Sequence, residues 1–287
     1  MVDFGSIGIT LPYTNQANAR VLCPRCSEQH HNRKKTLSCD TERGIFQCFR
    51  CGWKGQVAGD IGWTEYKPDS TAIEAHRSKR QYAIDCVMSE SMPISAGPAE
   101  VARRYLTSRL GSLPNTLPAL RYHPALRYYH DGKRQGEYPA IIAEIRNITG
   151  RLVTLHRTYI TEDGRKAPVE SPKKIMGVPE GSCAGAAIRL NPASEEIVIA
   201  EGIETALALS GMMRLPAWAA ISAHGMESIL LPEVVRVVHI GADNDRSGRG
   251  QEAAERLGIR LASEGLSIWI HTPDKIGTDW ADEKVQP

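Results

Sequence analysis

The chain has 287 residues, of which 41% are hydrophobic and 24% charged, and this is typical of a soluble globular protein of roughly two domains. No apolar run approaches the ~20 residues of a membrane helix, and the N-terminus has neither the basic nor the apolar part of a signal peptide. We therefore expect a cytoplasmic protein that has no membrane partner.

The net charge of +2 hides an asymmetry along the chain. Residues 1–194 carry 27 Lys and Arg against 18 Asp and Glu, whereas residues 195–287 carry 8 against 15. A basic part suits a polyanion such as nucleic acid, and an acidic part suits divalent cations. Two solvated surfaces of different sign would give the same counts.

Five of the seven cysteines fall between residues 23 and 51, which indicates a metal site in a reducing compartment and not a disulfide framework. The stretches "CPRC" and "CFRC" are separated by 21 residues, and two such pairs can present four thiolates to one Zn²⁺ ion. We predict a zinc ribbon over residues 20–56 whose ligands are Cys23, Cys26, Cys48 and Cys51. Cys39 is expected in the core of the ribbon, in one of two short strands around the turn "DTERG". Replacement of one ligand by Cys39 or by a histidine of the pair His30 and His31 stays open.

The predicted ribbon is rich in cationic and aromatic side chains. Together these suit single-stranded nucleic acid, although they could instead only pack and solvate a very small domain. The main candidates for nucleic-acid contact are Arg33, Lys34 and Trp53, within a set that also contains Arg25, Lys35, Arg43, Phe46, Phe49, Arg50 and Lys54.

Residues 57–70 are expected to be a linker, and residues 71–194 a helical and basic α+β subdomain. One helix is predicted from Thr71 to about Ser91, and another follows Pro98 and is closed by Gly111. A hairpin is predicted with strands 138–146 and 151–160, and "YYHDGKRQG" before it is expected to be a charged turn.

Residues 195–287 alternate between strands and helices. The predicted strands are 197–200, 217–222, 235–241 and 266–271, and the predicted helices are 202–213, 226–231 and 248–264. Short apolar runs that alternate with helices indicate a parallel sheet with right-handed crossovers. The predicted fold class is therefore α/β, with an N-terminal zinc ribbon and a mixed α+β middle part.

Acidic residues follow two strands of this predicted sheet. Glu201 comes after the first, and Asp243 and Asp245 come after the third. The carboxyl ends of parallel strands face a shared crevice, and carboxylates gathered there repel one another unless a cation such as Mg²⁺ neutralises them. Asp279 or Asp282 could add to the group, with Asp279 favoured.

Any one of these acids could instead cap a helix or pair with its dipole. Glu204, one turn into a predicted helix, fits that interpretation about as well as a role in supporting the other acids.

The stretches "VIAEGIETALA" and "HIGADNDRSGRG" resemble the two signature motifs of the Toprim domain, which bacterial and phage primases, topoisomerases, recombination-mediator proteins and some nucleases share. The order of zinc ribbon, basic middle and acidic C-terminal part is similar to that of DNA primases, and the all-cysteine ribbon is more like that of phage and plasmid primases. The resemblance covers about residues 20–55 and 138–282. It implies that Glu201 assists nucleotidyl transfer and that Asp243 and Asp245 hold Mg²⁺ or Mn²⁺. The match at Asp279 is looser.

The same resemblance implies that basic residues of the middle part contact the template and the incoming nucleoside triphosphate. The candidates are Arg157, Lys166, Lys173 and Lys174, with Arg157 and Lys174 favoured. Each could instead lie on an ordinary solvated strand.

The resemblance implies a primase that makes short RNA primers on single-stranded DNA by metal-assisted nucleotidyl transfer. Two alternatives stay open: a non-catalytic DNA-binding protein like a recombination mediator, and a Toprim nuclease. A topoisomerase would need a large gate domain with a tyrosine nucleophile, for which 287 residues leave no room. The sequence has no "GxxxxGK[ST]" motif, so a replicative helicase or an initiator would be a separate partner.

Overall fold

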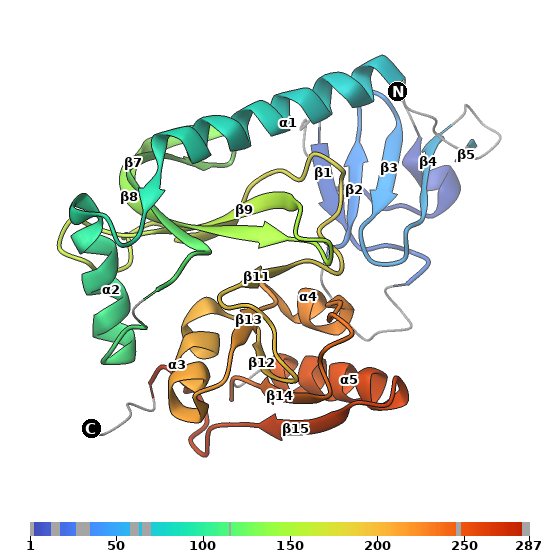
Figure 1. Ribbon diagram of the computed structural model, residues 1–287. Helices are drawn as coiled ribbons and strands as arrows, with labels where there is room; N and C mark the ends of the chain where they lie inside the picture. Colours follow the sequence, from blue (N-terminus) through green and yellow to red (C-terminus); the bar gives the residue numbers. More distant parts are fainter. Residues whose placement is uncertain are drawn as a thin grey trace. The chain divides into compact units, whose positions relative to one another are not determined.

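The computed structural model describes residues 3–12, 18–26, 35–57, 63–64, 70–114, 116–244 and 248–282 (Figure 1). The chain divides into two compact units, Met1–Ile73 and Glu74–Pro287. The division into four segments that the sequence suggests stays a prediction beside this division into two.

The N-terminal unit contains a small antiparallel sheet. Its strands are β1 (Asn18–Val21), β2 (Leu37–Asp40), β3 (Ile45–Cys48), β4 (Lys54–Val57) and β5 (Trp63–Thr64), in that order, and the 3-10 helix η1 (Phe4–Ile7) precedes them. The core contains Phe4, Leu37, Cys39 and Phe46. Cys39 is fully buried there on β2, which confirms the expectation that it faces the core.

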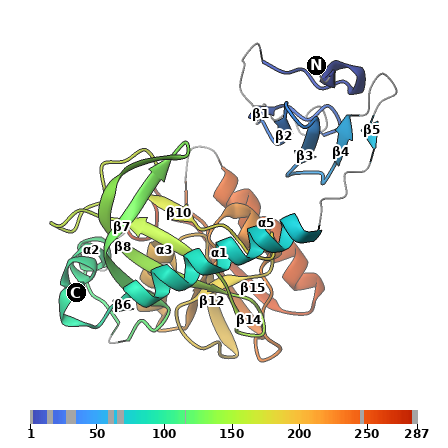
Figure 2. The same ribbon diagram turned by 90° about the horizontal axis from the view of Figure 1, so that it is seen from above.

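Three helical segments follow along the chain: α1 (Ser70–Glu90), which spans the boundary between the two units, η3 (Gly97–Ala99) and α2 (Glu100–Leu110). Both predicted α-helices are therefore present, and Gly111 ends α2 with a positive φ of 78°. Most of α1 is exposed, and its buried residues Ile84 and Val87 pack with Leu126 and Tyr128 of β7. Figure 2 shows that α1 lies across the sheet.

The middle of the chain contains antiparallel strands: β6 (Met92–Pro93), β7 (Leu120–His130), β8 (Lys133–Arg146), β9 (Leu152–Tyr159) and β10 (Lys173–Ile175). The two longest, β7 and β8, form a hairpin. The predicted hairpin of β8 and β9 is present. The charged turn expected in "YYHDGKRQG" is present but shorter than expected, because β7 and β8 run through the stretch and leave only Asp131 and Gly132 between them. Both have positive φ, 47° and 75°, the geometry that a two-residue hairpin turn requires.

The rest of the chain alternates strands and helices as predicted. The elements are β11 (Ala187–Arg189), β12 (Glu196–Ala200), α3 (Ile203–Met213), β13 (Ala217–Ala219), α4 (Ala223–Ser228), β14 (Val237–Gly241), α5 (Arg249–Ser263) and β15 (Ser267–His271). The helix predicted at 226–231 begins three residues earlier, because the Ser222 side chain accepts a hydrogen bond from the Gly225 amide and caps it.

One sheet runs through the whole C-terminal unit. Its order is β10-β9-β8-β11-β13-β12-β14-β15, and β13, β12, β14 and β15 are parallel (Figure 1). Strand β11 is antiparallel to both β8 and β13, so it joins the antiparallel half to the parallel half.

Helices cover both faces of the parallel half. Buried residues of α3 pack with Val198 and Ala200 of β12, whereas those of α5 pack with Ile197 and Ile199 of the same strand. The predicted fold class is confirmed: α/β, with an N-terminal cysteine cluster, then a middle part and, last along the chain, a mostly parallel sheet. None of the helices in the described residues is both long enough and apolar enough to cross a membrane.

Candidate metal centre and acidic active site

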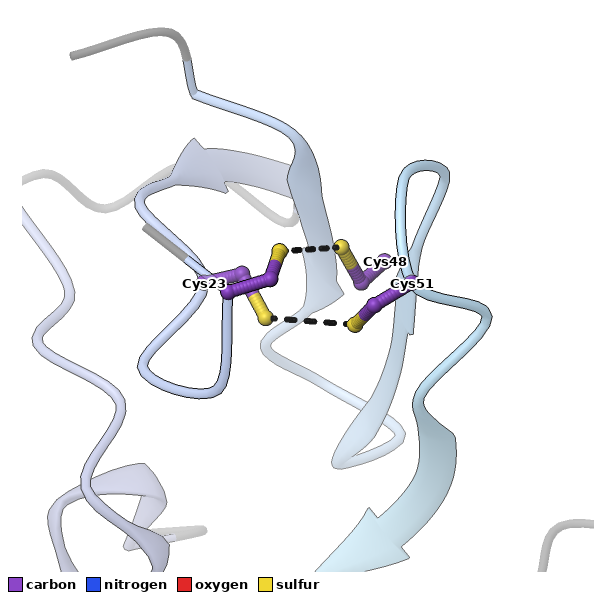
Figure 3. A group of neighbouring side chains, drawn as sticks. Cys23, Cys48 and Cys51 are labelled. Atoms are coloured by element: carbon purple, nitrogen blue, oxygen red, sulfur yellow. Dashed lines mark hydrogen bonds between the residues drawn. The ribbon is translucent and has the colours of Figure 1, made fainter. Parts of the chain in front are cut away.

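Four cysteines of the N-terminal unit point their sulfur atoms toward one another (Figure 3). The distance from Cys23 Sγ to Cys51 Sγ is 3.8 Å, and that from Cys26 Sγ to Cys48 Sγ is 3.7 Å. A tetrahedral zinc ion with Zn–S bonds of about 2.3 Å holds its sulfur ligands about 3.8 Å apart. All four sulfur atoms lie within 4.8 Å of one another, so the cluster suits a zinc ion, whereas Cys39 lies outside the cluster and the histidine pair 30–31 lies outside the described residues.

The local backbone prepares one of these thiols for metal binding. Burial raises the pKa of Cys48, but hydrogen bonds from the Cys51 amide, the Thr36 hydroxyl and the Arg50 amide outweigh it and lower the pKa to about 6. In contrast, burial raises the pKa of Cys23 to about 12. Because zinc binds thiolates, one ligand is ionised near neutral pH, and the ion would have to displace the proton of Cys23.

Glu201 and Asp243 leave the parallel sheet at the same edge. Strands β12 and β14 are parallel neighbours in which Ala200 lies opposite Gly241, so Glu201 is level with Ala242 and Asp243 is one residue beyond. Neighbouring strands are about 4.8 Å apart. The two acids therefore follow adjacent strand ends, and their oxygen donors are of the kind that Mg²⁺ or Mn²⁺ prefers. Asp245 lies outside the described residues.

Three hydrogen bonds orient the segment that carries Asp243. The Thr205 hydroxyl on α3 donates to Asp243 Oδ1 at 3.0 Å. The next residue, Asn244, donates from Nδ2 to the Pro273 carbonyl at 2.7 Å and accepts from Gln251 Nε2 at 2.9 Å. These contacts anchor the segment to α3, to α5 and to the loop after β15.

Asp279 has a cationic partner within the protein. Arg109 on α2 contacts Asp279 Oδ2 at 3.1 Å and Asp282 Oδ1 at 3.0 Å. Within the described residues, the cysteine cluster is the one group of at least three candidate ligands whose donor atoms converge. A role for Asp279 in metal binding stays a prediction, and the ion would compete with Arg109 for this carboxylate.

The two favoured basic candidates also have partners within the protein. Arg157 on β9 donates to the Tyr159 hydroxyl at 3.2 Å and to the Ile175 carbonyl at 3.3 Å. Lys174 on β10 lies 4.4 Å from the centre of the Tyr128 ring and donates to the Tyr129 carbonyl. These contacts favour structural roles for both side chains.

Lys173 and Lys166 differ in their surroundings. Lys173 Nζ lies 2.8 Å from Glu204 Oε2, and the Tyr105 hydroxyl donates to Glu204 Oε1, also at 2.8 Å. Glu204 is only 5% exposed. Lys166 is exposed and follows a turn beside α2, where Gly164 approaches the backbone of Tyr105.

The surroundings of Glu204 could not be predicted from the sequence, because its partner Tyr105 is 99 residues away. Burial raises its pKa, but Lys173, a backbone hydrogen bond and Tyr105 together lower it to about 2. The neighbouring His156 is buried, and burial together with the Lys173 charge lowers its pKa to about 4. At neutral pH, Glu204 is therefore an ionised carboxylate next to a neutral imidazole.

The ribbon surface also differs from expectation. Trp53 is 7% exposed, packs on Phe46 with ring centres 4.6 Å apart, and has the Arg25 guanidinium 4.7 Å from its ring centre. Its ring is therefore part of the core, which disfavours base stacking. Phe49 is 61% exposed, and the Arg20 guanidinium lies 5.0 Å from its ring centre. Phe49 is therefore better placed than Trp53 to stack on a base. Residues 33 and 34, the predicted Arg33 and Lys34 contacts, lie outside the described residues.

Two family models match the chain. Residues 196–286 match the Toprim domain, and residues 78–189 match a family described as a domain of unknown function (DUF7146). The C-terminal part of the chain is therefore a Toprim domain, which confirms the resemblance seen in the two acidic motifs. No curated protein matches the chain in sequence.

Several solved primase structures are similar to this one. The zinc binding and RNA polymerase domains of the Aquifex aeolicus primase are 16% identical over 96% of this chain and 77% of that one, with a TM-score of 0.45. The DnaG primase catalytic domain bound to single-stranded DNA is 15% identical over 75% of this chain and 78% of that one, with a TM-score of 0.48. The primase fragment of the bacteriophage T7 primase-helicase protein is 13% identical over 91% of this chain and 92% of that one, with a TM-score of 0.40.

Proposed function

We propose that this chain is a DNA-dependent primase, which joins nucleoside triphosphates into short RNA primers on a single-stranded DNA template. One observation supports this most directly: in a Toprim domain, two parallel neighbouring strands end in register and each is followed by an acid, Glu201 and Asp243. Carboxylates at such an edge suit metal-assisted phosphoryl chemistry. The four-cysteine cluster and the positive charge of residues 1–194 suit a partner with a phosphate backbone.

In this proposal Asp243 and Asp245 hold Mg²⁺ or Mn²⁺, which neutralises charge on the reacting phosphates. Side chains of the protein position the reacting groups and accept the proton. Glu201 accepts the proton of the attacking 3′-hydroxyl or orients that hydroxyl. The hydrogen bond from Thr205 to Asp243 Oδ1 fixes the orientation of the carboxylate that would hold the ion.

We further propose that the template contacts the ribbon through Arg33, Lys34 and the exposed ring of Phe49, because cationic and aromatic side chains together suit single strands. In the C-terminal unit, the exposed Lys166 is the basic residue that we favour for contact with the nucleoside triphosphate. Arg157 and Lys174 then act mainly by supporting the sheet.

The test is incorporation of radiolabelled ribonucleotides on short single-stranded DNA templates with Mg²⁺ or Mn²⁺. Glu201→Gln and Asp243→Asn should each lose at least about 100-fold in rate, because each removes a charge that the reacting groups require. Glu233→Gln, at an exposed loop acid, is the matched control and should keep the wild-type rate.

Other results would point to other Toprim chemistry. DNA cleavage in Mg²⁺ without nucleotides, abolished by the same two substitutions, would indicate a nuclease. DNA binding with neither synthesis nor cleavage would indicate a protein like a recombination mediator. Wild-type synthesis by Glu201→Gln and Asp243→Asn would remove the proposed roles of these acids.

A further inference from the structure

Three residues of the C-terminal unit that are far apart in the sequence contact one another, with two of them buried and the third, Lys173, at the surface. Glu204 on α3 is 5% exposed, and its two carboxylate oxygens have separate partners, the Tyr105 hydroxyl on α2 and Lys173 Nζ on β10, both at 2.8 Å. A buried carboxylate with a hydroxyl and an ammonium bonded to different oxygens is fully engaged, and losing either partner is costly. We call Tyr105, Lys173 and Glu204 the α3 anchor.

The α3 anchor lies beside the acidic edge of the sheet. Glu204 is in the first turn of α3, which begins at Ile203, two residues after Glu201. The next residue, Thr205, donates to Asp243. A displacement of this turn would therefore move Glu201 and loosen Asp243 together.

We propose that Glu204 is a positioning residue, and that Lys173 is its counter-ion and not a phosphate contact. By binding α2 and β10, Glu204 fixes the first turn of α3 and so sets the relative positions of Glu201 and Asp243. The effect on primer synthesis rests on the proposed function, whereas the effects on folding and on ion binding do not. Tyr105 supports the same turn through the other carboxylate oxygen.

Replacing both Lys173 and Glu204 by uncharged residues distinguishes a counter-ion role of Lys173 from a phosphate-binding role. Lys173→Met alone leaves a buried negative charge without its counter-ion, which is strongly destabilising. Glu204→Gln removes the charge and keeps an oxygen that can accept from Tyr105. The double variant has neither charge, so it should recover much of what Lys173→Met loses. A lysine that binds phosphate would show no such recovery.

The experiment is a double-mutant cycle on the full zinc-loaded chain, with two readouts that need no enzymatic activity. The first is the Tm of the C-terminal unit, and the second is the Kd for Mn²⁺ from calorimetry. We expect Lys173→Met to lower the Tm by about 5 °C or more and to weaken Mn²⁺ binding several-fold. The double variant with Glu204→Gln should regain more than half of both losses.

The neighbouring Lys174 supplies the matched control, because its ammonium donates to a backbone carbonyl and not to Glu204. Lys174→Met should show no recovery when combined with Glu204→Gln. If Lys173→Met does not fold, Lys173→Arg keeps the charge and must bind Mn²⁺ as the wild type does.

Purely additive effects of Lys173→Met and Glu204→Gln on both readouts would overturn the inference. So would an unchanged Tm in Lys173→Met together with a raised KM for nucleotides, which would make Lys173 a phosphate contact. If the wild type makes no primers, the proposed function fails, but the cycle on Tm and Mn²⁺ binding still decides the inference.

Discussion

The buried carboxylate of Glu204 should give the protein a measurable loss of stability in mild acid. Its pKa is about 2 in the folded chain against an ordinary value of 4.5: burial raises it, but Lys173, a backbone hydrogen bond and Tyr105 together lower it. At about 1.4 kcal/mol per pH unit, this difference corresponds to about 3 kcal/mol of free energy of unfolding at neutral pH. The perturbation that tests it is a fall in pH, with Glu204→Gln as the comparison.

The sign of the effect follows from the direction of the pKa shift. Because folding lowers the pKa, the unfolded chain takes up the proton first as the pH falls. The stabilisation is therefore complete above about pH 5, has dropped by about 2 kcal/mol at pH 3, and is lost near pH 2. The variant Glu204→Gln lacks the titrating group and should not show this component.

The assay is urea unfolding of the full chain, followed by circular dichroism at several pH values between 7 and 3 and at constant ionic strength. Between pH 5 and pH 3 the wild type should lose about 2 kcal/mol more than Glu204→Gln. The exposed acid variant Glu233→Gln should follow the wild type. Parallel curves for the wild type and Glu204→Gln would refute the argument that Glu204 is ionised and held by Lys173.

Two further predictions concern the metal centre and the core. Cys48→Ser should unfold the small sheet of the N-terminal unit, because a structural zinc ion supplies about 10 kcal/mol or more, whereas Cys39→Ala should keep one zinc per chain. Hydrogen exchange and metal analysis check both, and a protected sheet in zinc-free Cys48→Ser would contradict the assignment. Gly241→Ala should cost about 1–3 kcal/mol, because its Cβ would lie 2.2 Å from Leu209 Cδ1. Gly211→Ala on α3, with open space around it, should not destabilise the fold in thermal unfolding, and equal Tm values for the two variants would contradict this.

The sequence alone was enough to predict the features that depend on local spacing. Two Cys-x-x-Cys pairs bring their thiols together because each pair lies in one tight turn, and the four sulfurs do converge. The alternation of apolar strands with helices predicted the parallel sheet, and acids at two strand ends predicted that Glu201 and Asp243 would share an edge. Each of these follows from periodicity and from the geometry of neighbouring residues.

Only the tertiary structure decided which charges meet. The partners Arg109 and Asp279 are 170 residues apart, and Tyr105 and Glu204 are 99 apart. Nothing in the local pattern around a lysine such as Lys173 distinguishes the counter-ion of a buried carboxylate from a solvated phosphate contact. Periodicity records whether a position faces the core, whereas an ion pair depends on how helices and strands from distant parts of the chain pack together, and that packing exists only in the folded protein.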